Sequence, residues 1–260
     1  MNTVNPSPIV LLTDFGNDPY VGIMKGRILQ INPFANVITL TNHIQNHNIR
    51  QGAFILLKSY QNFPPNTIFL IVVDPGVGSA RRAIAAKCGD YYFVGPDNGI
   101  LSPILEKKKG VRIIQLTIPE DASDTFHGRD VFAPSAAKLS QNYLLNTLGP
   151  PSDLKSSINF FWEPSTNTGE VIFIDHFGNI ITNLPYSKEL LLNNQYNIIT
   201  DKVKETVCFK RSYFEGSNIK PFMIVSSFGT LEIALRNRKA SKFLDIKPED
   251  RIRILPAEKE

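Results

Sequence analysis

The chain has 260 residues, of which 42% are hydrophobic, 20% charged and 10% aromatic. This length accommodates one large domain or two smaller ones, and the hydrophobic content is too high for a disordered chain. The net charge of +4 comes from 28 basic and 24 acidic residues that are dispersed along the sequence. A nucleic-acid-binding protein usually concentrates its basic residues on one face, and a membrane helix needs roughly 18 consecutive apolar residues. We therefore expect a protein that binds neither nucleic acid nor membrane.

Cysteine usage and the N-terminal sequence favour a cytoplasmic location. Cys88 and Cys208 are too few for a disulfide framework, and MNTVNPSPIV lacks the basic and apolar stretches of a signal peptide. His43 and His47 are four residues apart, but no cysteine or third histidine is placed to complete a zinc site. We expect the protein to use no metal and no cofactor.

Apolar runs and amphipathic stretches alternate along the first half of the chain. The continuous run Ile9–Thr13 is typical of a buried strand, and the apolar spacing that follows predicts a helix over Tyr20–Ile31. The same alternation predicts helices at Ile49–Tyr60 and Ala133–Leu148, and strands at Val37–Leu40, Thr67–Val73, Ala83–Lys87, Tyr91–Val94 and Val111–Leu116. This order predicts an α/β domain over residues 1–160, with a parallel-rich sheet flanked by helices.

The second half of the chain has a different character. A proline-containing stretch, Gly149–Thr168, suits a linker, and short β-like runs separated by turn residues follow it. The predicted strands are Glu170–Ile174, Asn179–Thr182, Val203–Phe209, Met223–Ser226, Leu231–Leu235 and Arg251–Leu255. We expect a smaller antiparallel β domain over residues 161–260, either a sandwich or a barrel.

Polar residues gather where ligands bind in open α/β sheets, at the carboxyl ends of strands. The first predicted strand leads into Asp14 and Asp18, the strand ending at Val73 leads into Asp74, and His127 precedes a predicted helix. Each has a simpler interpretation. Asp18 is equally suited to cap a helix, Asp74 before Pro-Gly to shape a turn, and a lone histidine is more often a core residue.

Five sequence strings resemble one family: TDFGNDPYVGIMKG (Thr13–Gly26), VVDPGVGSARR (Val72–Arg82), GPDNG (Gly95–Gly99), FHGRDVFAPSAA (Phe126–Ala137) and IDHFGNIITN (Ile174–Asn183). The chain resembles the S-adenosyl-L-methionine hydrolases (adenosine-forming), also called S-adenosylmethionine hydroxide adenosyltransferases. These enzymes are related to the fluorinating and chlorinating enzymes that use the same substrate. The resemblance extends from about Pro8 to Leu255, nearly the whole chain.

The resemblance implies hydrolysis of S-adenosyl-L-methionine to adenosine and L-methionine, by attack of water or hydroxide on ribose C5′. The family's water-holding residues match Asp74, Arg81 and His127. Because free water has a pKa of about 15.7, it must lose a proton as it attacks or be held as hydroxide beside positive charge. An arginine supplies that charge without losing its own proton. Which of the three residues accepts the proton is open at this stage.

Other family residues also match positions of this chain. Asp14 matches a ribose-binding aspartate, and Asp18 and Tyr20 lie in the same segment and are expected to line the pocket. In the second half, the resemblance implies that Asp175 receives the ammonium of the methionine part of the substrate, and that Phe177 and Asn179 contact the adenine. Tyr213 is expected to supply a second aromatic face. Ser227 matches a residue that contacts the methionine, and Glu232 lies on the strand that follows. The family forms its site between subunits of a trimer, so the resemblance implies a homotrimer with sites at subunit interfaces.

Several positions depart from the family pattern. Thr39 and Asn42 stand where relatives commonly have an aspartate and a histidine, and His47 stands where a tryptophan is frequent. The stretch from Arg236 to Lys239 replaces a smaller, glycine-containing one. These departures keep a second hypothesis open, that of a non-catalytic module that binds S-adenosylmethionine or adenosine.

A third hypothesis is a halide-dependent 5′-halo-adenosine synthase. By resemblance, halogenating relatives lack the aspartate and histidine found here at Asp74 and His127, and the fluorinating enzymes carry a small hydroxyl residue in place of Gly128. A carboxylate also repels a nearby halide. The sequence therefore favours the hydrolase.

Overall fold

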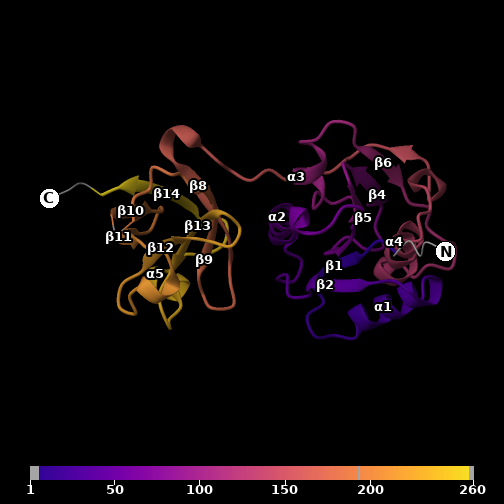
Figure 1. The fold of residues 1–260 in the computed structure, drawn as a ribbon, viewed down its shortest axis with the longest axis horizontal. Coiled ribbons are helices and arrows are strands. Elements are labelled where there is room, and N and C mark those ends of the chain that lie inside the picture. The colour runs from indigo at the N-terminus through magenta and orange to yellow at the C-terminus, as the bar shows by residue number, and fades with distance from the viewer. Residues whose placement is uncertain (1–5, 193, 258–260) are drawn as a thin grey trace. The chain divides into compact units, whose positions relative to one another are not determined.

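The computed structural model describes residues 6–192 and 194–257, which form two compact units that divide between Ile158 and Asn159 (Figure 1). Each unit has its own cluster of buried hydrophobic side chains. The first unit is a sheet covered by helices, and the second is a β-barrel. The structure thus has the predicted fold class, an α/β unit followed by a smaller β unit.

The first unit is built on a seven-stranded sheet with strand order β2-β1-β3-β5-β4-β6-β7. Its strands are β1 (Ile9–Thr13), β2 (Val37–Thr41), β3 (Ile68–Val72), β4 (Ala83–Cys88), β5 (Tyr91–Pro96), β6 (Arg112–Gln115) and β7 (Pro151–Ser152). The strands from β2 to β5 pair in parallel, whereas β4, β6 and β7 add antiparallel pairings. β4 runs antiparallel because the tight turn at Gly89, with φ of 56°, returns the chain directly beside it.

Helices cover both faces of this sheet, with α1 and α4 on one face and α2 on the other (Figure 1). The helices of the unit are α1 (Tyr20–Ile31), α2 (Ile49–Ser59), α3 (Ser102–Leu105) and α4 (Ala133–Ser140). Ile9 and Leu11 of β1 belong to the hydrophobic cluster that contains the buried side chains of α1 and α4. Leu12 points to the opposite face, where it lies against Gly52 of α2. Because successive strand residues alternate between faces, the fully apolar strand β1 is buried from both sides.

The helix predicted over Ala133–Leu148 begins at Ala133 as expected, but its predicted C-terminal end is wrong. It ends at Ser140, because Asn142 adopts a left-handed conformation with φ of 65° and the N–H of Tyr143 donates to the Lys138 carbonyl over 3.2 Å. These two features form a C-terminal cap that stops the helix. At its start, α4 continues directly from a π-helical turn over Gly128–Phe132, immediately after His127.

The second unit is a closed seven-stranded barrel with strand order β10-β11-β12-β13-β9-β8-β14, so the structure selects the barrel from the two predicted alternatives. Its elements are β8 (Thr168–Ile174), β9 (Ile180–Pro185), β10 (Gln195–Ile199), β11 (Lys204–Phe209), β12 (Phe222–Val225), β13 (Thr230–Ala234), β14 (Arg251–Pro256) and the helix α5 (Ala240–Leu244). Sequence analysis missed β10, which closes the barrel by pairing with both β11 and β14. β11 and β12 pair in parallel, and the other barrel pairings are antiparallel.

Short 3₁₀ turns at Tyr60–Asn62, Leu145–Thr147, Pro164–Thr166 and Tyr213–Glu215 complete the secondary structure. In residues 6–192 and 194–257, no helix is long and apolar enough to cross a membrane. The same residues contain no group of three or more His, Cys, Asp or Glu side chains placed to hold a metal ion.

Candidate active site

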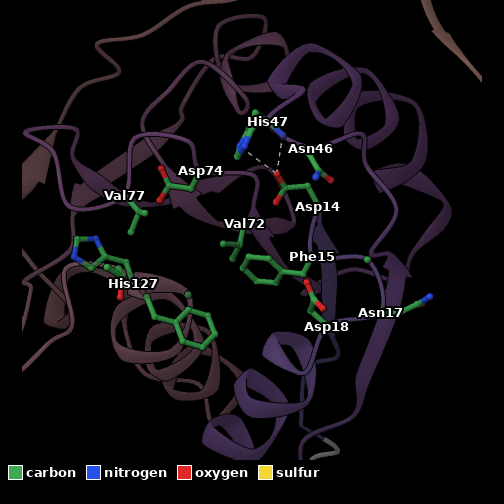
Figure 2. A pocket seen from close by; sticks show the side chains of 14 residues that line it. Asp14, Phe15, Asn17, Asp18, Asn46, His47, Val72, Asp74, Val77 and His127 are labelled. Atoms are coloured by element: carbon green, nitrogen blue, oxygen red, sulfur yellow. Dashed lines mark hydrogen bonds and ion pairs between the residues drawn. The ribbon is translucent and has the colours of Figure 1, made fainter.

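A cavity of about 340 Å³ lies in the first unit at the carboxyl ends of β1 and β3 (Figure 2). These strands are parallel neighbours, with Thr13 opposite Val72, so the loops that follow them meet at one edge of the sheet. The lining residues come from four segments, 14–18, 46–47, 72–77 and 125–128. They include four of the residues singled out from the sequence, Asp14, Asp18, Asp74 and His127.

The structure brings Asp74, Arg81 and His127 together. Nε of Arg81 donates to Oδ1 of Asp74 over 2.9 Å, and Nη2 of Arg81 donates to Oδ2 of the same carboxylate. Nη2 also lies 2.8 Å from Nδ1 of His127. The side chains of Arg81 and Asp74 are 8% and 4% exposed. A bidentate pair this well buried has a fixed geometry, and the histidine is hydrogen-bonded directly to it.

Two loops position these side chains. Gly78 has φ of 77°, and a Cβ there would lie 2.5 Å from the carbonyl oxygen of Asp124, so only glycine allows the loop after Asp74 to approach the loop before His127. The second loop is closed by Asp130, whose carboxylate accepts the N–H of Ser123 over 3.0 Å. The glycine and the aspartate thus fix the approach of the two segments.

The hydrogen bond from Arg81 determines the tautomer of His127. A guanidinium has only donors, so Nδ1 of His127 accepts and the imidazole proton lies on Nε2. Burial lowers the pKa of His127 below its ordinary value of 6.5, and the nearby Arg81 charge lowers it further, against a smaller opposing effect of Asp74. His127 is therefore neutral near pH 7 and a hydrogen-bond donor at Nε2.

Arg81 retains one unused donor. Its Nη1 is buried, and no hydrogen-bond acceptor is placed for it among the residues that the structure describes. The guanidinium carbon lies 5.3 Å from the centre of the Phe132 ring, which covers it from the π-helical turn. A buried donor without an acceptor is costly, so this atom is suited to bind a water molecule or an anion.

Asp14 is fixed by the segment that carries His47. Oδ2 of Asp14 accepts the backbone N–H of His47 over 2.9 Å, and Nδ1 of His47 lies 3.9 Å from the same oxygen (Figure 2). His47 has φ of 66°, a left-handed conformation that places its N–H toward the carboxylate. Asn42, one of the departures from the family pattern, accepts the N–H of Gly16 through its backbone carbonyl over 2.7 Å. The substituted segment therefore supports the Asp14 loop.

The remaining predicted residues of this segment differ in their relation to the cavity. Asp18 lines it and is exposed, whereas Tyr20 packs against Phe15 and Phe126 with ring-centre distances of 5.3 Å and 5.4 Å. Phe15 and Phe126 themselves line the cavity. Sequence analysis missed both phenylalanines as lining residues, although each stands next to a residue that it had singled out, and it missed Asn46, which no motif marked.

In the second unit, Asp175 and Asn179 close the turn between β8 and β9. The backbone N–H and Nδ2 of Asn179 donate to the two carboxylate oxygens of Asp175 over 2.8 Å and 3.0 Å. Gly178 has φ of 88°, and a Cβ there would meet the Lys239 side chain at 2.5 Å. Phe177, at the tip, is 72% exposed. An exposed ring held on a rigid turn is suited to stack on a flat ligand.

Tyr213 and Glu232 form a second buried polar pair in this unit. The hydroxyl of Tyr213 donates to Oε1 of Glu232 over 2.5 Å, and Glu232 is 2% exposed on β13. Burial raises the pKa of Glu232 to about 7; the hydrogen bond from Tyr213 opposes this rise, and the charge of Asp175 adds a smaller one. Burial also raises the pKa of Tyr213, as do the charges of Glu232 and Asp175.

Two other predicted positions of this unit lie on turns. Ser227 is exposed in the turn between β12 and β13. Arg236, at the start of the substituted stretch, follows β13, and its Nη1 donates to the Phe214 carbonyl over 3.1 Å. Lys239 ends the stretch and packs on Gly178. The replaced residues thus connect the turn after β8 with the 3₁₀ turn that begins at Tyr213.

Comparison with known proteins identifies the family. Residues 9–149 match the SAM hydroxide adenosyltransferase N-terminal domain, and residues 169–253 match the SAM hydroxide adenosyltransferase C-terminal domain. The chain belongs to the SAM hydroxide adenosyltransferase family. It is 37% identical to a protein of Methanocaldococcus jannaschii named (R)-S-adenosyl-L-methionine hydrolase, over 95% of each chain, and 34% identical to one of the same name from Salinispora tropica, over 96% of this chain and 98% of that one.

More distant relatives and solved structures agree with this assignment. A fluorinase from an Actinoplanes species is 26% identical and covers 69% of this chain and 72% of its own. The structure is similar to the crystal structure of an uncharacterised conserved protein from Thermotoga maritima, with a TM-score of 0.89 and 33% identity over 95% of this chain and 100% of that one. A conserved hypothetical protein from Thermus thermophilus gives a TM-score of 0.79 at 31% identity, over 96% and 100% of the two chains.

Proposed function

We propose that this protein hydrolyses S-adenosyl-L-methionine to adenosine and L-methionine. The observation that carries the proposal is the hydrogen-bonded set of Asp74, Arg81 and His127 at the cavity of the first unit. Full-length similarity to proteins named (R)-S-adenosyl-L-methionine hydrolase supports it. By resemblance, the halogenating enzymes lack the aspartate and the histidine that this chain has at Asp74 and His127.

In the proposed reaction, a water oxygen forms a bond to C5′ of the ribose while the bond from C5′ to sulfur breaks. The electron pair of that bond leaves on sulfur, which becomes the neutral thioether of methionine, so the leaving group needs no proton. The attacking water loses one proton in all. Alignment of the water oxygen, C5′ and sulfur is the main contribution that a fixed site can make.

The tautomer of His127 limits which residue accepts that proton. Nδ1 of His127 is occupied by Arg81, so His127 orients the water as a donor through Nε2. Arg81 stabilises the developing hydroxide by its charge and its unused Nη1 donor. The carboxylate of Asp74 keeps lone pairs beyond its two bonds to Arg81. We therefore assign proton acceptance to Asp74, with release of the proton to solvent through the cavity.

We assign the ribose hydroxyls to Asp14, whose Oδ1 remains beside the Oδ2 that accepts from His47. Asp18 lines the same cavity, and Tyr20 supports its aromatic wall. In the second unit, we assign the methionine ammonium to Asp175 and the adenine to Phe177 and Asn179. Since Nδ2 of Asn179 is used by Asp175, its Oδ1 is the atom suited to accept from the adenine amino group. The proposal also places Tyr213, Ser227 and Glu232 around the methionine and adenine.

We further propose that the protein acts as a cytoplasmic homotrimer, with each site shared between subunits. The family resemblance and the exposed Phe177 side chain support the shared site. Cys88 and Cys208 are both free, as is usual for proteins of a reducing compartment. Sedimentation equilibrium measures the assembly state, and a fully active monomer would contradict this part of the proposal.

Incubation of the purified protein with S-adenosyl-L-methionine in H₂¹⁸O tests the reaction. We expect adenosine and methionine in equal amounts, with the label in the 5′-hydroxyl of adenosine, and a large loss of turnover in Asp74→Ala. Calorimetry accompanies the assay. Tight binding without adenosine above the level of a heat-killed sample would favour the non-catalytic binding module. Formation of 5′-chloro-adenosine in chloride would favour the halide-dependent transferase.

A further inference from the structure

The GPDNG string (Gly95–Gly99) spans the end of β5 and the turn that follows it. None of its residues has a role in the reaction proposed above. Its residues are not among those that line the cavity of the first unit. Four of the five are buried, and Asp97 is buried although it carries a charge. A buried carboxylate is retained only where other groups compensate its charge.

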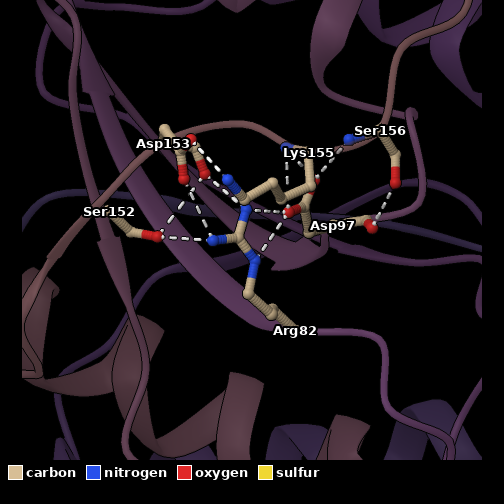
Figure 3. A network of polar contacts seen from close by, with 6 residues as sticks. All are labelled: Arg82, Asp97, Ser152, Asp153, Lys155 and Ser156. Carbon is tan, nitrogen blue, oxygen red and sulfur yellow. Dashed lines mark hydrogen bonds and ion pairs between the residues drawn. The ribbon is translucent and has the colours of Figure 1, made fainter.

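The partner of Asp97 is Arg82, the residue directly after the proposed catalytic Arg81. The Asp97 carboxylate accepts Nε of Arg82 over 3.0 Å and also accepts Nη2, while its backbone N–H donates to the Arg82 carbonyl over 2.9 Å (Figure 3). The Asp97 side chain is 1% exposed. Arg82 is therefore held through both its backbone and its side chain, which fixes the point where the chain leaves Arg81.

Asn98 makes a corresponding contact beside Asp74, the partner of Arg81. Its Nδ2 donates to the carbonyl of Val73 over 2.9 Å. Val73 is fully buried and directly precedes Asp74, so this bond fixes the end of the strand that delivers the carboxylate. Consecutive residues, Asp97 and Asn98, thus hold the two flanks of the loop between Asp74 and Arg81.

The two glycines of the string allow the close packing that these contacts need. A Cβ at Gly95 would lie 2.8 Å from the carbonyl oxygen of Ile71 in the neighbouring strand β3. Gly99 has φ of 96°, and a Cβ there would lie 2.8 Å from the Ile158 side chain. Larger residues at either position would displace the turn.

The same carboxylate also holds the segment that leads out of the first unit. Asp97 accepts the backbone N–H groups of Lys155 and Ser156, and the Ser156 hydroxyl donates to the Asp97 carbonyl over 2.9 Å (Figure 3). Ser102 holds the next turn of this segment by accepting the N–H of Ile158 over 2.8 Å. These bonds do not touch Val73 or Arg82, so they provide matched controls.

We propose that Asp97 and Asn98 are positioning residues, which set the geometry of the Asp74–Arg81 pair from outside the cavity by fixing Arg82 and Val73. This inference rests on the proposed hydrolase function. Both catalytic side chains are delivered by one polar loop, so their relative placement depends on how its two ends are held. A displacement of about 1 Å in a reacting group lowers turnover on the order of a hundredfold.

The first test compares Asn98→Ala and Asn98→Asp with the unaltered protein. Both variants remove the donor to Val73, and the second preserves the shape of the side chain. We expect kcat to fall on the order of tenfold to a hundredfold, with KM for S-adenosyl-L-methionine changed less than about twofold. The stoichiometry of adenosine binding by calorimetry reports the fraction of folded sites and is expected to stay unchanged. Asp97→Asn is likewise expected to lower kcat while changing KM less than about twofold.

Ser156→Ala and Ser102→Ala are the controls, because neither removes a bond to Val73 or Arg82. Ser156→Ala removes the hydroxyl bond to the Asp97 carbonyl, and Ser102→Ala removes the bonds of the Ser102 hydroxyl to the Ile158 N–H and the Gly99 carbonyl. We expect them to keep kcat within about twofold of the unaltered protein. Unchanged kcat in both Asn98 variants, or an equal loss of kcat in the serine controls, would overturn the inference. If the unaltered protein forms no adenosine, the proposed function fails instead, so the two failures are distinguishable.

Discussion

Nη2 of Arg81 donates to Nδ1 of His127 over 2.8 Å and to Asp74 through its second hydrogen. One nitrogen therefore joins the carboxylate to the imidazole. The arrangement depends on a planar guanidinium, which presents its donors at fixed angles. An ammonium of similar charge has no such geometry.

Arg81→Lys is expected to lower kcat on the order of a hundredfold or more, because a lysine retains the charge but not the simultaneous bonds to Asp74 and His127. Chromatographic measurement of adenosine release tests this expectation. Arg112→Lys, at an exposed position on β6, is the matched control. Comparable activity of the two variants would show that charge alone is sufficient.

The neutral state of His127 predicts an acidic limb in the dependence of kcat on pH. Because burial and the Arg81 charge hold its pKa below 6.5, protonation occurs only under more acidic conditions, where it abolishes the acceptor at Nδ1. We expect kcat to be constant above pH 6.5 and to decline as pH falls through the His127 pKa. His127→Gln offers an amide acceptor and donor without a titrating group. This variant is expected to lose the acidic limb, and a persistent limb would assign it to another residue.

Phe177→Ala is expected to weaken adenosine binding about 5- to 140-fold, the loss that corresponds to one stacked base. Since the ring is 72% exposed, the melting temperature is expected to change little. Phe34→Ala, at an 84% exposed phenylalanine that does not line the cavity of the first unit, is the control. Equal adenosine affinity in the Phe177 variant and the unaltered protein, measured by calorimetry, would remove Phe177 from the adenine site.

Glu232→Gln is expected to change how stability depends on pH. The folded-state pKa of about 7 exceeds the ordinary 4.5, so the folded protein binds more protons and the free energy of unfolding falls as pH rises from 4.5 through about 7. The glutamine variant lacks this contribution. The free energy of unfolding of the variant minus that of the unaltered protein is therefore expected to be larger at about pH 8 than at about pH 5. Denaturant unfolding at both pH values measures the difference, and a constant difference would contradict the prediction.

Gly128→Ser tests the relation to the halogenating enzymes. A Cβ at this position lies 3.1 Å from both Met24 and Phe126, so a serine fits only if those side chains shift slightly. We expect reduced hydrolysis and no 5′-chloro-adenosine in chloride, because the Asp74 carboxylate still repels an anion at the site. Mass spectrometry of the nucleoside products distinguishes the two outcomes, and a chlorinated product would show that Gly128 alone excludes halide.

The fold was largely predictable because its signals are local. The run Ile9–Thr13 is apolar throughout, as a strand buried on both faces requires, and the structure places a strand at those residues. The helix predicted to Leu148 was too long, because its end depends on the left-handed Asn142 rather than on hydrophobic spacing. β10 was missed because its short alternation of polar and apolar residues becomes a strand only by pairing with β11 and β14.

The candidate site was predictable only where motifs carried it. Asp74, Arg81 and His127 stand in specific strings, and the structure brings them into contact across 46 positions of sequence between Arg81 and His127. Asn46 and Phe126 reach the cavity through loop geometry, which has no periodic signal. The bond from Arg81 to Nδ1, and with it the His127 tautomer, depends on the three-dimensional arrangement of the two side chains, which no sequence pattern indicates.

Closure of the second unit into a barrel constrains how it can associate. All seven strands described for this unit have neighbours on both sides, so none is an edge strand along which another chain could extend the sheet. Any assembly through this unit must be built from side chains and turns, such as the one bearing Phe177. Recognition between copies would then depend on residue identity at a few protruding turns, and substitutions there could alter assembly while the barrel remains intact.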